Sequence, residues 1–339
     1  MNKELKLAEL KQPVVVTGAF GFLGKRTIDA LLALGASKIV AFDLPGFQLP
    51  EEWQENVRYI QGDISNKADV KKMIEGAGTV IHLAAMVGDW IPLPLHRKVT
   101  VEGSRALFEE AVSNDTRVVL SSSIVVYGDK LTTNPSPEDK EWGKPVGPYS
   151  ICKQRQEKLA FRYHEKESMW LSVVRPANVY GAGSKPWVHD AVEALKSGAP
   201  ILIDGGDFNA ALVHVDNVVQ MLLLAATKDE ALGQVFNGGD GNSATWKQYM
   251  SDLAEVLELP KPKSIPLWLI KPLSGGIENI WRILKLKKRP PLTREALNLV
   301  CAETIIPIQK AKDLLGYVPE VGYEEGFEEV KQYVEKELM

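Results

Sequence analysis

Tyr149 and Lys153 are the two residues of this chain whose types and spacing most directly suggest chemistry. Residues four apart on an α-helix lie on the same face, so the phenol and the ammonium would be neighbours. A nearby cation favours phenolate over phenol, which would let Tyr149 exchange a proton with a substrate oxygen. Lowering a tyrosine pKa from ~10 to ~7 takes about 4 kcal/mol, more than one exposed ammonium normally supplies. A second positive charge beside the pair would therefore help.

A glycine-rich loop near the start of the chain indicates what could bind beside this pair. Residues 14–17 form a β-branched run, and a helical pattern begins after the loop. Glycines spaced by three suit a tight turn, close approach of backbone to a pyrophosphate, and a helix N-terminus that binds phosphate. The alternative is a tight turn alone. The loop residues expected to contact a dinucleotide are Gly18, Phe20, Gly21, Phe22, Leu23 and Gly24.

Asp43 ends the second β-branched run and indicates which dinucleotide would bind. A carboxylate at this place accepts hydrogen bonds from a ribose 2′-hydroxyl and repels a 2′-phosphate. Neither Ala41 nor Leu44 offers the cation that NADP would need. The alternative is an aspartate that serves only the turn. NAD is therefore the expected cofactor.

The first half of the chain alternates short β-branched runs with amphipathic segments, which indicates a parallel sheet covered by helices on both faces. The predicted fold is therefore α/β, a Rossmann-type doubly wound sheet. From about Pro176 this alternation ends, and glycine, proline and tryptophan become frequent. The change favours a smaller mixed substrate domain interleaved with the sheet. The expected divisions are an extension at 1–12, the NAD-binding domain at 13–175, and the substrate domain at 176–339. The expected strands are 14–17, 39–43, 57–61, 80–83, 118–121 and 171–175, and the expected helices are 25–34, 67–75, 101–112 and a C-terminal pair within 310–339.

Composition excludes several classes of protein. The net charge of −4 lacks the basic excess of a nucleic-acid surface, and two cysteines are too few for a disulfide framework or a metal cage. No metal is therefore expected. The N-terminus lacks the apolar core of a signal peptide, and no run reaches the ~20 apolar residues of a membrane span, so a cytoplasmic location is expected.

A serine run follows the strand expected at 118–121. Ligands of open α/β sheets bind outside the carboxyl ends of the strands, so these hydroxyls should face the ligand. Ser123 could then bind the same substrate oxygen as Tyr149. The alternative is a loop of turn-forming residues.

Together with Gly62-Asp63, His82 to Ala85 and Arg175 to Gly181, these motifs resemble the extended short-chain dehydrogenase/reductase family, from Val14 to about Val321. The resemblance implies that Tyr149 is the acid/base, that Lys153 lowers its pKa and binds the nicotinamide ribose, and that Ser123 orients the substrate oxygen. It also implies a homodimer formed through the Tyr149 helix and the helix before it. The cofactor contacts that it implies are Asp63 and Ile64 at the adenine, Leu83, Ala84 and Ala85 along the cofactor, Ser121, Ser122, Tyr149, Lys153 and Asn178 near it, and Pro176 and Val179 beside the nicotinamide.

Departures from particular branches of that family narrow the reaction. Sugar-nucleotide dehydratases carry Thr-Asp-Glu where this chain has Ser123-Ile124-Val125, so water elimination is disfavoured. Nucleotide-sugar epimerases have an arginine that pairs with the diphosphate, whereas residues 207–217 contain neither arginine nor lysine. The run Val-His-Val-Asp-Asn at 213–217 looks instead like the 3β-hydroxysteroid dehydrogenase-like branch. His214 in that run could be a ligand, although a packed histidine is favoured.

The segment 265–289 combines apolar residues at helical spacing with a basic end. It could pack on the second domain, cover an apolar pocket, or contact a membrane surface peripherally. The expected activity is NAD-dependent interconversion of an alcohol and a ketone on a sterol-like or β-hydroxy/β-keto acid substrate, with or without decarboxylation. The alternatives are a nucleotide-sugar 4-epimerase and a non-catalytic dinucleotide sensor. The residues expected to contact the substrate are Met86, Val87, Trp90, Ser123, Asn178 and Trp187.

Overall fold

The computed structural model describes residues 9–133, 135–284, 286, 288–301 and 303–339. Most of the predicted N-terminal extension, residues 1–8, lies outside the described residues. Among the helices of the described part, none combines the length and apolar character that a membrane crossing requires.

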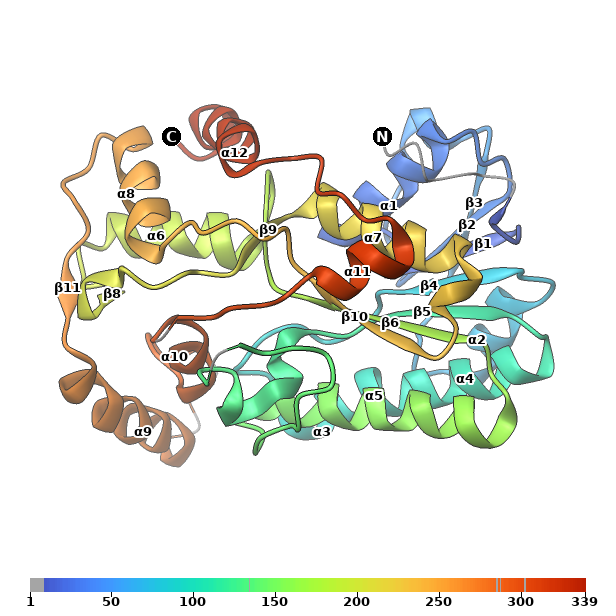
Figure 1. The fold of residues 1–339 in the computed structure, drawn as a ribbon, viewed down its shortest axis with the longest axis horizontal. Coiled ribbons are helices and arrows are strands. Elements are labelled where there is room, and N and C mark those ends of the chain that lie inside the picture. The colour runs from blue at the N-terminus through green and yellow to red at the C-terminus, as the bar shows by residue number, and fades with distance from the viewer. Residues whose placement is uncertain (1–8, 134, 285, 287, 302) are drawn as a thin grey trace.

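A seven-stranded parallel sheet forms the centre of the molecule, in the order β10-β6-β5-β4-β1-β2-β3 (Figure 1). Successive residues of its strands point to opposite faces, so Val14 and Val16 enter one hydrophobic core and Val15 the other. The predicted doubly wound sheet is therefore confirmed. The strands are β1 (Val14–Thr17), β2 (Ile39–Asp43), β3 (Val57–Gln61), β4 (Thr79–His82), β5 (Arg117–Ser121), β6 (Leu171–Pro176) and β10 (Gln234–Gly238).

Helices cover both faces of this sheet. One face is packed by α1 (Phe22–Ala33), α7 (Val215–Thr227) and α11 (Gln309–Leu315). The other is packed by α2 (Lys67–Ile74), α4 (Gly103–Ser113) and α5 (Pro148–Glu167), seen below the sheet in Figure 1. The first helix begins three residues before its predicted start, because Gly21 has the extended backbone of an N-cap.

Residues beyond 176 both complete the sheet and build a second core. Strand β10 and helix α7 belong to the sheet layers, and neither was predicted. The second core lies among α6 (Asp190–Lys196), α8 (Trp246–Val256) and α12 (Tyr323–Glu337). This part also contains two short parallel pairs, β7 (Asn178–Tyr180) with β9 (Leu212–His214) and β8 (Leu202–Ile203) with β11 (Ser264–Ile265).

The C-terminal third ends in four helices, α9 (Leu267–Ile283), α10 (Arg294–Val300), α11 and α12. The predicted helical pair within 310–339 is confirmed, because α11 ends at Gly316, whose φ of 63° only glycine adopts readily. Helix α9 contacts α10 and extends from the body at the lower left of Figure 1.

Candidate active site

Tyr149 lies in the first turn of α5, whose start is fixed by local sequence. Pro148 occupies the first helical position, and the Ser150 hydroxyl accepts hydrogen bonds from the Val146 and Gly147 amides at 2.9 and 3.0 Å. The Tyr149 side chain hydrogen-bonds to Ser123, which follows β5. The structure therefore brings together two of the three predicted catalytic side chains.

Burial raises the pKa of Tyr149 to about 12, and the hydrogen bond to Ser123 only partly offsets this rise. The carboxylate of Glu295 raises the pKa further. Desolvation of the phenolate therefore dominates in this structure, and the lowering of the Tyr149 pKa by Lys153 stays a prediction. The phenol is thus protonated at neutral pH.

Lys153 is buried one turn further along α5. Its Nζ donates to the Ser121 carbonyl oxygen at 2.8 Å and to Gln156 Oε1 at 3.0 Å. Burial lowers the pKa of Lys153 to about 8, although the charge of Glu157 opposes this change. The ammonium is therefore held at the end of β5, beside the Ser123 loop.

A buried chain of hydrogen bonds runs from β1 to Lys153. The Gln156 amide nitrogen donates to Ser104 Oγ at 2.8 Å, and His82 Nε2 lies 2.8 Å from the same oxygen. Because Ser104 Oγ donates its own hydrogen to the Thr100 carbonyl, His82 Nε2 must carry a hydrogen and donate it.

The other ring nitrogen of His82, Nδ1, then accepts from the Thr17 hydroxyl at 2.8 Å. Thr17 Oγ1 in turn accepts the Leu83 and Ala84 amides at 3.1 and 3.0 Å. Burial, with the charge of Lys153, lowers the pKa of His82 to about 3, which agrees with a neutral ring. These hydrogen bonds connect the ends of β1 and β4 to Lys153. Sequence reasoning missed Thr17, Ser104 and Gln156. Thr17 is the one polar residue of strand β1, whereas Ser104 and Gln156 lie among other polar residues of α4 and α5 and give no distinct signal.

Ser122 differs from its neighbours in the serine run. Its hydroxyl donates to Glu157 Oε2 at 2.6 Å, and Glu157 forms a buried ion pair with Arg175 at 2.5 Å. Arg175 also donates to the Tyr127 hydroxyl and to the Glu138 carbonyl. The predicted cofactor residue Ser122 therefore belongs to a structural network that joins α5 and β6 to the segment following β5.

The glycine loop has the geometry that a dinucleotide requires. At Gly18 φ is +68°, and an added Cβ would lie 3.2 Å from the Ala84 backbone, while at Gly24 it would overlap the Gly18 carbonyl. Helix α1 has no side-chain cap and no acidic residue in its first turn, so its first amides are open to an anion. These features fit the pyrophosphate of NAD.

Asp43 and Phe20 connect this loop to β2. The Asp43 carboxylate accepts the Phe20 amide at 2.9 Å and the Leu44 amide at 2.8 Å, and its partly exposed oxygens retain lone pairs for ribose hydroxyls. The Phe20 ring stacks on Phe47, with ring centroids 4.7 Å apart. Phe20 therefore contacts Asp43 through its backbone amide, while its ring packs elsewhere.

The other predicted cofactor residues follow the carboxyl ends of the strands. Asp63 follows β3 and accepts the Ser65 amide at 2.8 Å, and Ile64 beside it is buried. The half-buried Leu83, Ala84 and Ala85 follow β4, and Pro176 ends β6. In β7, Val179 is half-buried, while the Asn178 amide is buried and donates to the Ala210 carbonyl at 2.7 Å.

Besides Ser123 after β5 and Asn178 in β7, the predicted substrate residues fall in two places. Met86, Val87 and Trp90 lie in the loop after β4, where the Arg282 guanidinium from α9 covers the Trp90 ring at 5.3 Å. Trp187 instead packs on Trp246 with ring centroids 4.8 Å apart, in the second core. The first group follows β4, the strand beside β5, after which Ser123 lies, whereas Trp187 belongs to the second core.

Glu295 of α10 is a site residue that sequence reasoning missed. Its carboxylate accepts the Ser150 amide at 2.6 Å and the Tyr149 amide at 3.3 Å, so it caps α5. An added Cβ at Gly147 would overlap this carboxylate. Burial raises the pKa of Glu295, and the hydrogen bonds to Ser150 and Tyr149 oppose that rise. No local pattern could reveal a cap that comes from 146 residues away.

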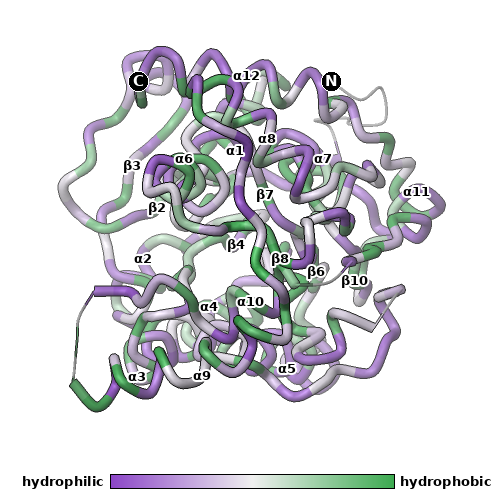
Figure 2. The backbone as a smooth tube through the Cα atoms, turned by 90° about the vertical axis from the view of Figure 1, so that its left-hand side faces the viewer, coloured by the Kyte–Doolittle hydropathy of each residue, from purple (hydrophilic) through white to green (hydrophobic). Residues whose placement is uncertain are grey.

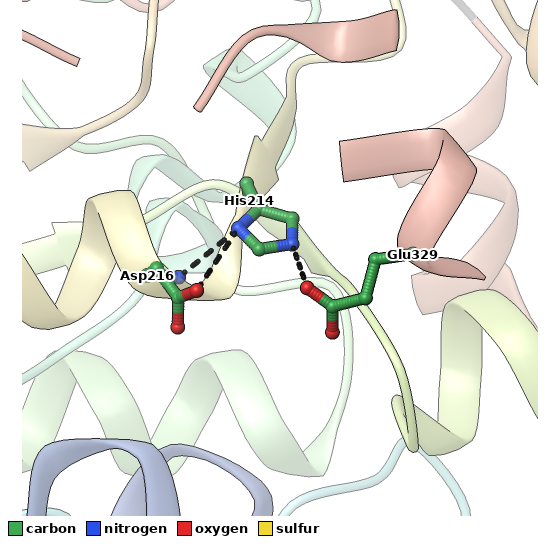
Figure 3. A group of neighbouring side chains, drawn as sticks. All are labelled: His214, Asp216 and Glu329. Carbon is green, nitrogen blue, oxygen red and sulfur yellow. Dashed lines mark hydrogen bonds and ion pairs between the residues drawn. The ribbon is translucent and has the colours of Figure 1, made fainter. Parts of the chain in front are cut away.

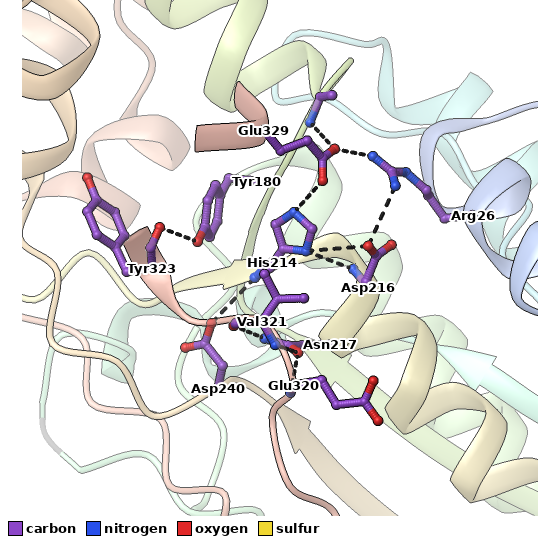
Figure 4. A network of polar contacts seen from close by, with 11 residues as sticks. Arg26, Tyr180, His214, Asp216, Asn217, Asp240, Glu320, Val321, Tyr323 and Glu329 are labelled. Carbon is purple, nitrogen blue, oxygen red and sulfur yellow. Dashed lines mark hydrogen bonds and ion pairs between the residues drawn. The ribbon is translucent and has the colours of Figure 1, made fainter. Parts of the chain in front are cut away.

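A second charged cluster, around His214 (Figure 3), includes residues of α1, α7 and α12, and α1 and α7 cover the face of the sheet opposite α5 (Figure 1). His214 Nε2 is 3.1 Å from Glu329 Oε2 of α12, and its Nδ1 accepts the Asp216 amide at 3.3 Å. The Arg26 guanidinium pairs with both carboxylates (Figure 4). Because an arginine already neutralises these acids, the cluster is explained as an ion-pair network, with His214 packed at the end of β9 as favoured from its sequence.

Comparisons with known proteins agree with this geometry. The chain is 26% identical over 349 residues to 3beta-hydroxysteroid-dehydrogenase/decarboxylase isoform 1 of Arabidopsis thaliana. This alignment covers 95% of this chain and 79% of that protein. It is 24% identical over 329 residues to 2-alkyl-3-oxoalkanoate reductase of Stenotrophomonas maltophilia, covering 94% of this chain and 98% of the relative. A solved UDP-glucose 4-epimerase of Thermotoga maritima with UDP-glucose is similar at a TM-score of 0.75 and 26% identity, over 96% of this chain and 99% of that one.

The family match extends over most of the residues described above. Residues 14–239, from the start of β1 to the end of β10, match the family described as "NAD dependent epimerase/dehydratase family". This chain therefore belongs to the NAD dependent epimerase/dehydratase family and is an NAD-dependent enzyme that acts on CH–OH groups.

Proposed function

We propose that this enzyme interconverts a secondary alcohol and a ketone on an apolar substrate, such as a sterol or a β-hydroxy or β-keto acid. The hydrogen bond between Tyr149 and Ser123, at the carboxyl end of β5, carries this proposal. Two fixed hydroxyls that meet at one substrate oxygen can stabilise a developing alkoxide. Because burial raises the pKa of Tyr149 to about 12, the phenol carries at neutral pH the proton that ketone reduction requires.

NAD, when bound, supplies the acceptor or donor of the hydride. For alcohol oxidation Tyr149 must accept a proton, which requires positive charge near the phenol. Lys153, with a pKa of about 8, is largely protonated at neutral pH, and Ser121 and Gln156 hold its ammonium. In this proposal Tyr149 moves the proton, Ser123 orients the oxygen, and Lys153 supplies the charge.

Two observations favour an apolar substrate. Residues 207–217 contain neither arginine nor lysine, although a diphosphate is normally bound by such cations. Two of the relatives are named for a steroid and for an alkyl-oxoalkanoate. When the substrate carries a carboxyl group β to the hydroxyl, oxidation gives a β-keto acid, which readily loses carbon dioxide. Decarboxylation could then follow hydride transfer without another catalytic group.

NADH formation tests the proposal directly. Purified enzyme with NAD would be supplied with a panel of 3β-hydroxysterols, their 4-carboxylated forms and β-hydroxy acids, and absorbance of NADH would be followed. We expect turnover on at least one of these classes and loss of about 10²–10⁴-fold in Tyr149→Phe, with NAD affinity retained. Failure of every class while NAD still binds would overturn the proposal.

A nucleotide-sugar 4-epimerase is the second candidate, favoured by the similarity to the Thermotoga maritima enzyme. Epimerisation uses the same hydride and proton transfers but produces no net NADH. Conversion of UDP-glucose to UDP-galactose, measured by chromatography without a change in NADH absorbance, would select this alternative. A sensor without catalysis predicts instead that Tyr149→Phe changes no turnover.

A further inference from the structure

Helix α9 buries polar side chains and exposes apolar ones, the reverse of the usual pattern for a helix of a globular protein. Its buried residues are Ser274 and Glu278, both polar, whereas Trp268 is 76% exposed and Ile283 is 77% exposed. At 100° per residue, the exposed apolar residues of the helix and its C-cap fall within an arc of about 160°, opposite the two buried polar ones. The large exposed apolar residues of this segment, here called the α9 face, are Trp268, Leu269, Leu273, Ile280, Ile283, Leu284 and Leu286. Figure 2 looks onto this side and shows α9 along the lower edge.

Specific polar contacts hold the helix in this orientation. Glu278 accepts the Arg294 amide at 2.6 Å and the Arg294 Nε at 3.0 Å, at the start of α10. Arg289 forms a bidentate pair with Asp89, at 2.7 and 2.6 Å. The polar side of α9 thus forms hydrogen bonds and ion pairs with the rest of the protein, and its apolar side faces outward. The expectation that the apolar residues of this segment pack on the second domain is not what the structure shows for the α9 face.

We propose that the α9 face docks this enzyme on the surface of an anionic phospholipid bilayer. The segment 261–289 contains eight lysines and arginines and one acidic residue, in a chain whose net charge is −4. Apolar side chains flanked by cations match the acyl boundary and the anionic headgroups of such a surface. A second copy of the chain fits less well, because a symmetric contact through this face would bring two basic segments together.

The α9 face is also connected to the candidate active site. Arg282 lies over Trp90 and Arg289 pairs with Asp89, both in the loop after β4. The adjoining helix α10 carries Glu295, which binds the amide of Tyr149. A bilayer under α9 would therefore lie beside the loop expected to admit substrate. This connection to a lipophilic substrate rests on the proposed function, whereas the docking surface does not.

Vesicle flotation tests the docking without using the reaction. The full chain with NAD would be floated with vesicles of phosphatidylcholine alone and of equal parts phosphatidylcholine and phosphatidylglycerol. We expect binding to the anionic vesicles that weakens as salt is raised. The double variant Trp268→Ser/Ile283→Ser should bind about ten-fold more weakly or worse. Val318→Ser, which removes an exposed apolar side chain outside α9, should bind like the wild type.

Equal thermal unfolding of the variants and the wild type would show that folding is intact. Absence of wild-type binding, or equal binding by the double variant, would overturn the docking proposal. So would a dimer that the double variant loses in analytical ultracentrifugation, because the α9 face would then be a contact between copies. Vesicle binding by an enzyme that turns over none of the tested alcohols would support docking while the proposed function fails.

Discussion

Glu295 shows how one side chain can serve both the fold and the candidate chemistry. Two backbone amides in the first turn of α5 have no partner within the helix, and Glu295 accepts both. The same amides carry the positive end of the helix dipole, which favours a carboxylate there. The position of the Tyr149 hydroxyl beside Ser123 therefore depends on a residue of α10.

Replacing Glu295 with alanine should disturb Tyr149 more than the cofactor site. We expect an unfolding free energy lower by about 1–3 kcal/mol, because two amides lose their acceptor. The turnover number should fall while NAD affinity changes little. Glu295→Gln, which keeps one acceptor oxygen, should recover most of the stability. Urea unfolding and NAD titration measure these effects. Equal losses of activity in both variants would point to the charge instead of the hydrogen bonds, and Glu335→Ala, an exposed acid on α12, is the control.

His82 gives the fold a dependence on acid whose sign follows from its tautomer. Its pKa is about 3 in the folded chain and near 6.5 when unfolded, so the unfolded chain binds the extra proton first. Stability contributed by the neutral ring is present above pH 6.5 and is lost as pH falls toward 3. Between pH 7.5 and 5 this loss amounts to about 2 kcal/mol. The free-energy difference between wild type and His82→Asn in urea unfolding should shrink by that amount, and a constant difference would contradict the assignment.

At the scale of elements, the sheet was predictable because its strands are β-branched and buried on both faces. All six predicted strands match within one residue at each boundary, and β4 alone is shifted, beginning and ending one residue before its predicted bounds. Strand β10 was missed because its residues, Gln-Val-Phe-Asn-Gly, include polar ones. It also lies beyond Pro176, where the alternation of strand and helix patterns in the sequence ends. The Tyr149, Lys153 and Ser123 cluster was predictable because it follows from spacing and strand ends. Glu295 and Gln156 were not, since tertiary packing alone brings them to the site.

Where α1 passes close to the loop that follows β1, there is no room for a side chain at Gly24. A Cβ at Gly24 would overlap the Gly18 carbonyl and the Ala19 backbone, and neither can move without displacing the loop. Gly24→Ala should therefore lower the unfolding free energy by about 1–3 kcal/mol and weaken NAD binding. Gly276→Ala is the matched control, because nothing lies near its added Cβ in α9 and alanine favours helix, so stability should stay equal or rise by up to ~1 kcal/mol. Calorimetry with and without NAD measures both. Equal effects at the two glycines would mean that helix propensity, not the lack of room at Gly24, decides.

At the scale of the whole molecule, the C-terminal helix returns to the first helix of the chain. Glu329 of α12 binds Arg26 of α1, faces His214 at the end of β9, and accepts the Ala182 amide at 3.1 Å (Figure 4). The network borders a hollow of about 410 Å³, whose lining also includes Val321 and, from α12, Glu325, Glu328 and Gln332. It joins the second core to the helix that follows the glycine loop, so the two halves of the chain should lose stability together.

Glu329→Gln tests this coupling. Burial raises the pKa of Glu329, but the His214 hydrogen bond and the Arg26 charge outweigh it and lower the pKa to about 2. The carboxylate therefore contributes stability above pH 4.5, and the contribution is lost as pH falls toward 2. We expect Glu329→Gln to lower the unfolding free energy by about 1–3 kcal/mol at pH 7 and by less at pH 3.5. Arg26→Met should show a coupling of about 1 kcal/mol or more with it in a double-mutant cycle. Glu325→Gln, on the exposed rim of the same hollow, should change little, and additive effects of the Arg26 and Glu329 variants would show that α12 and α1 are independent.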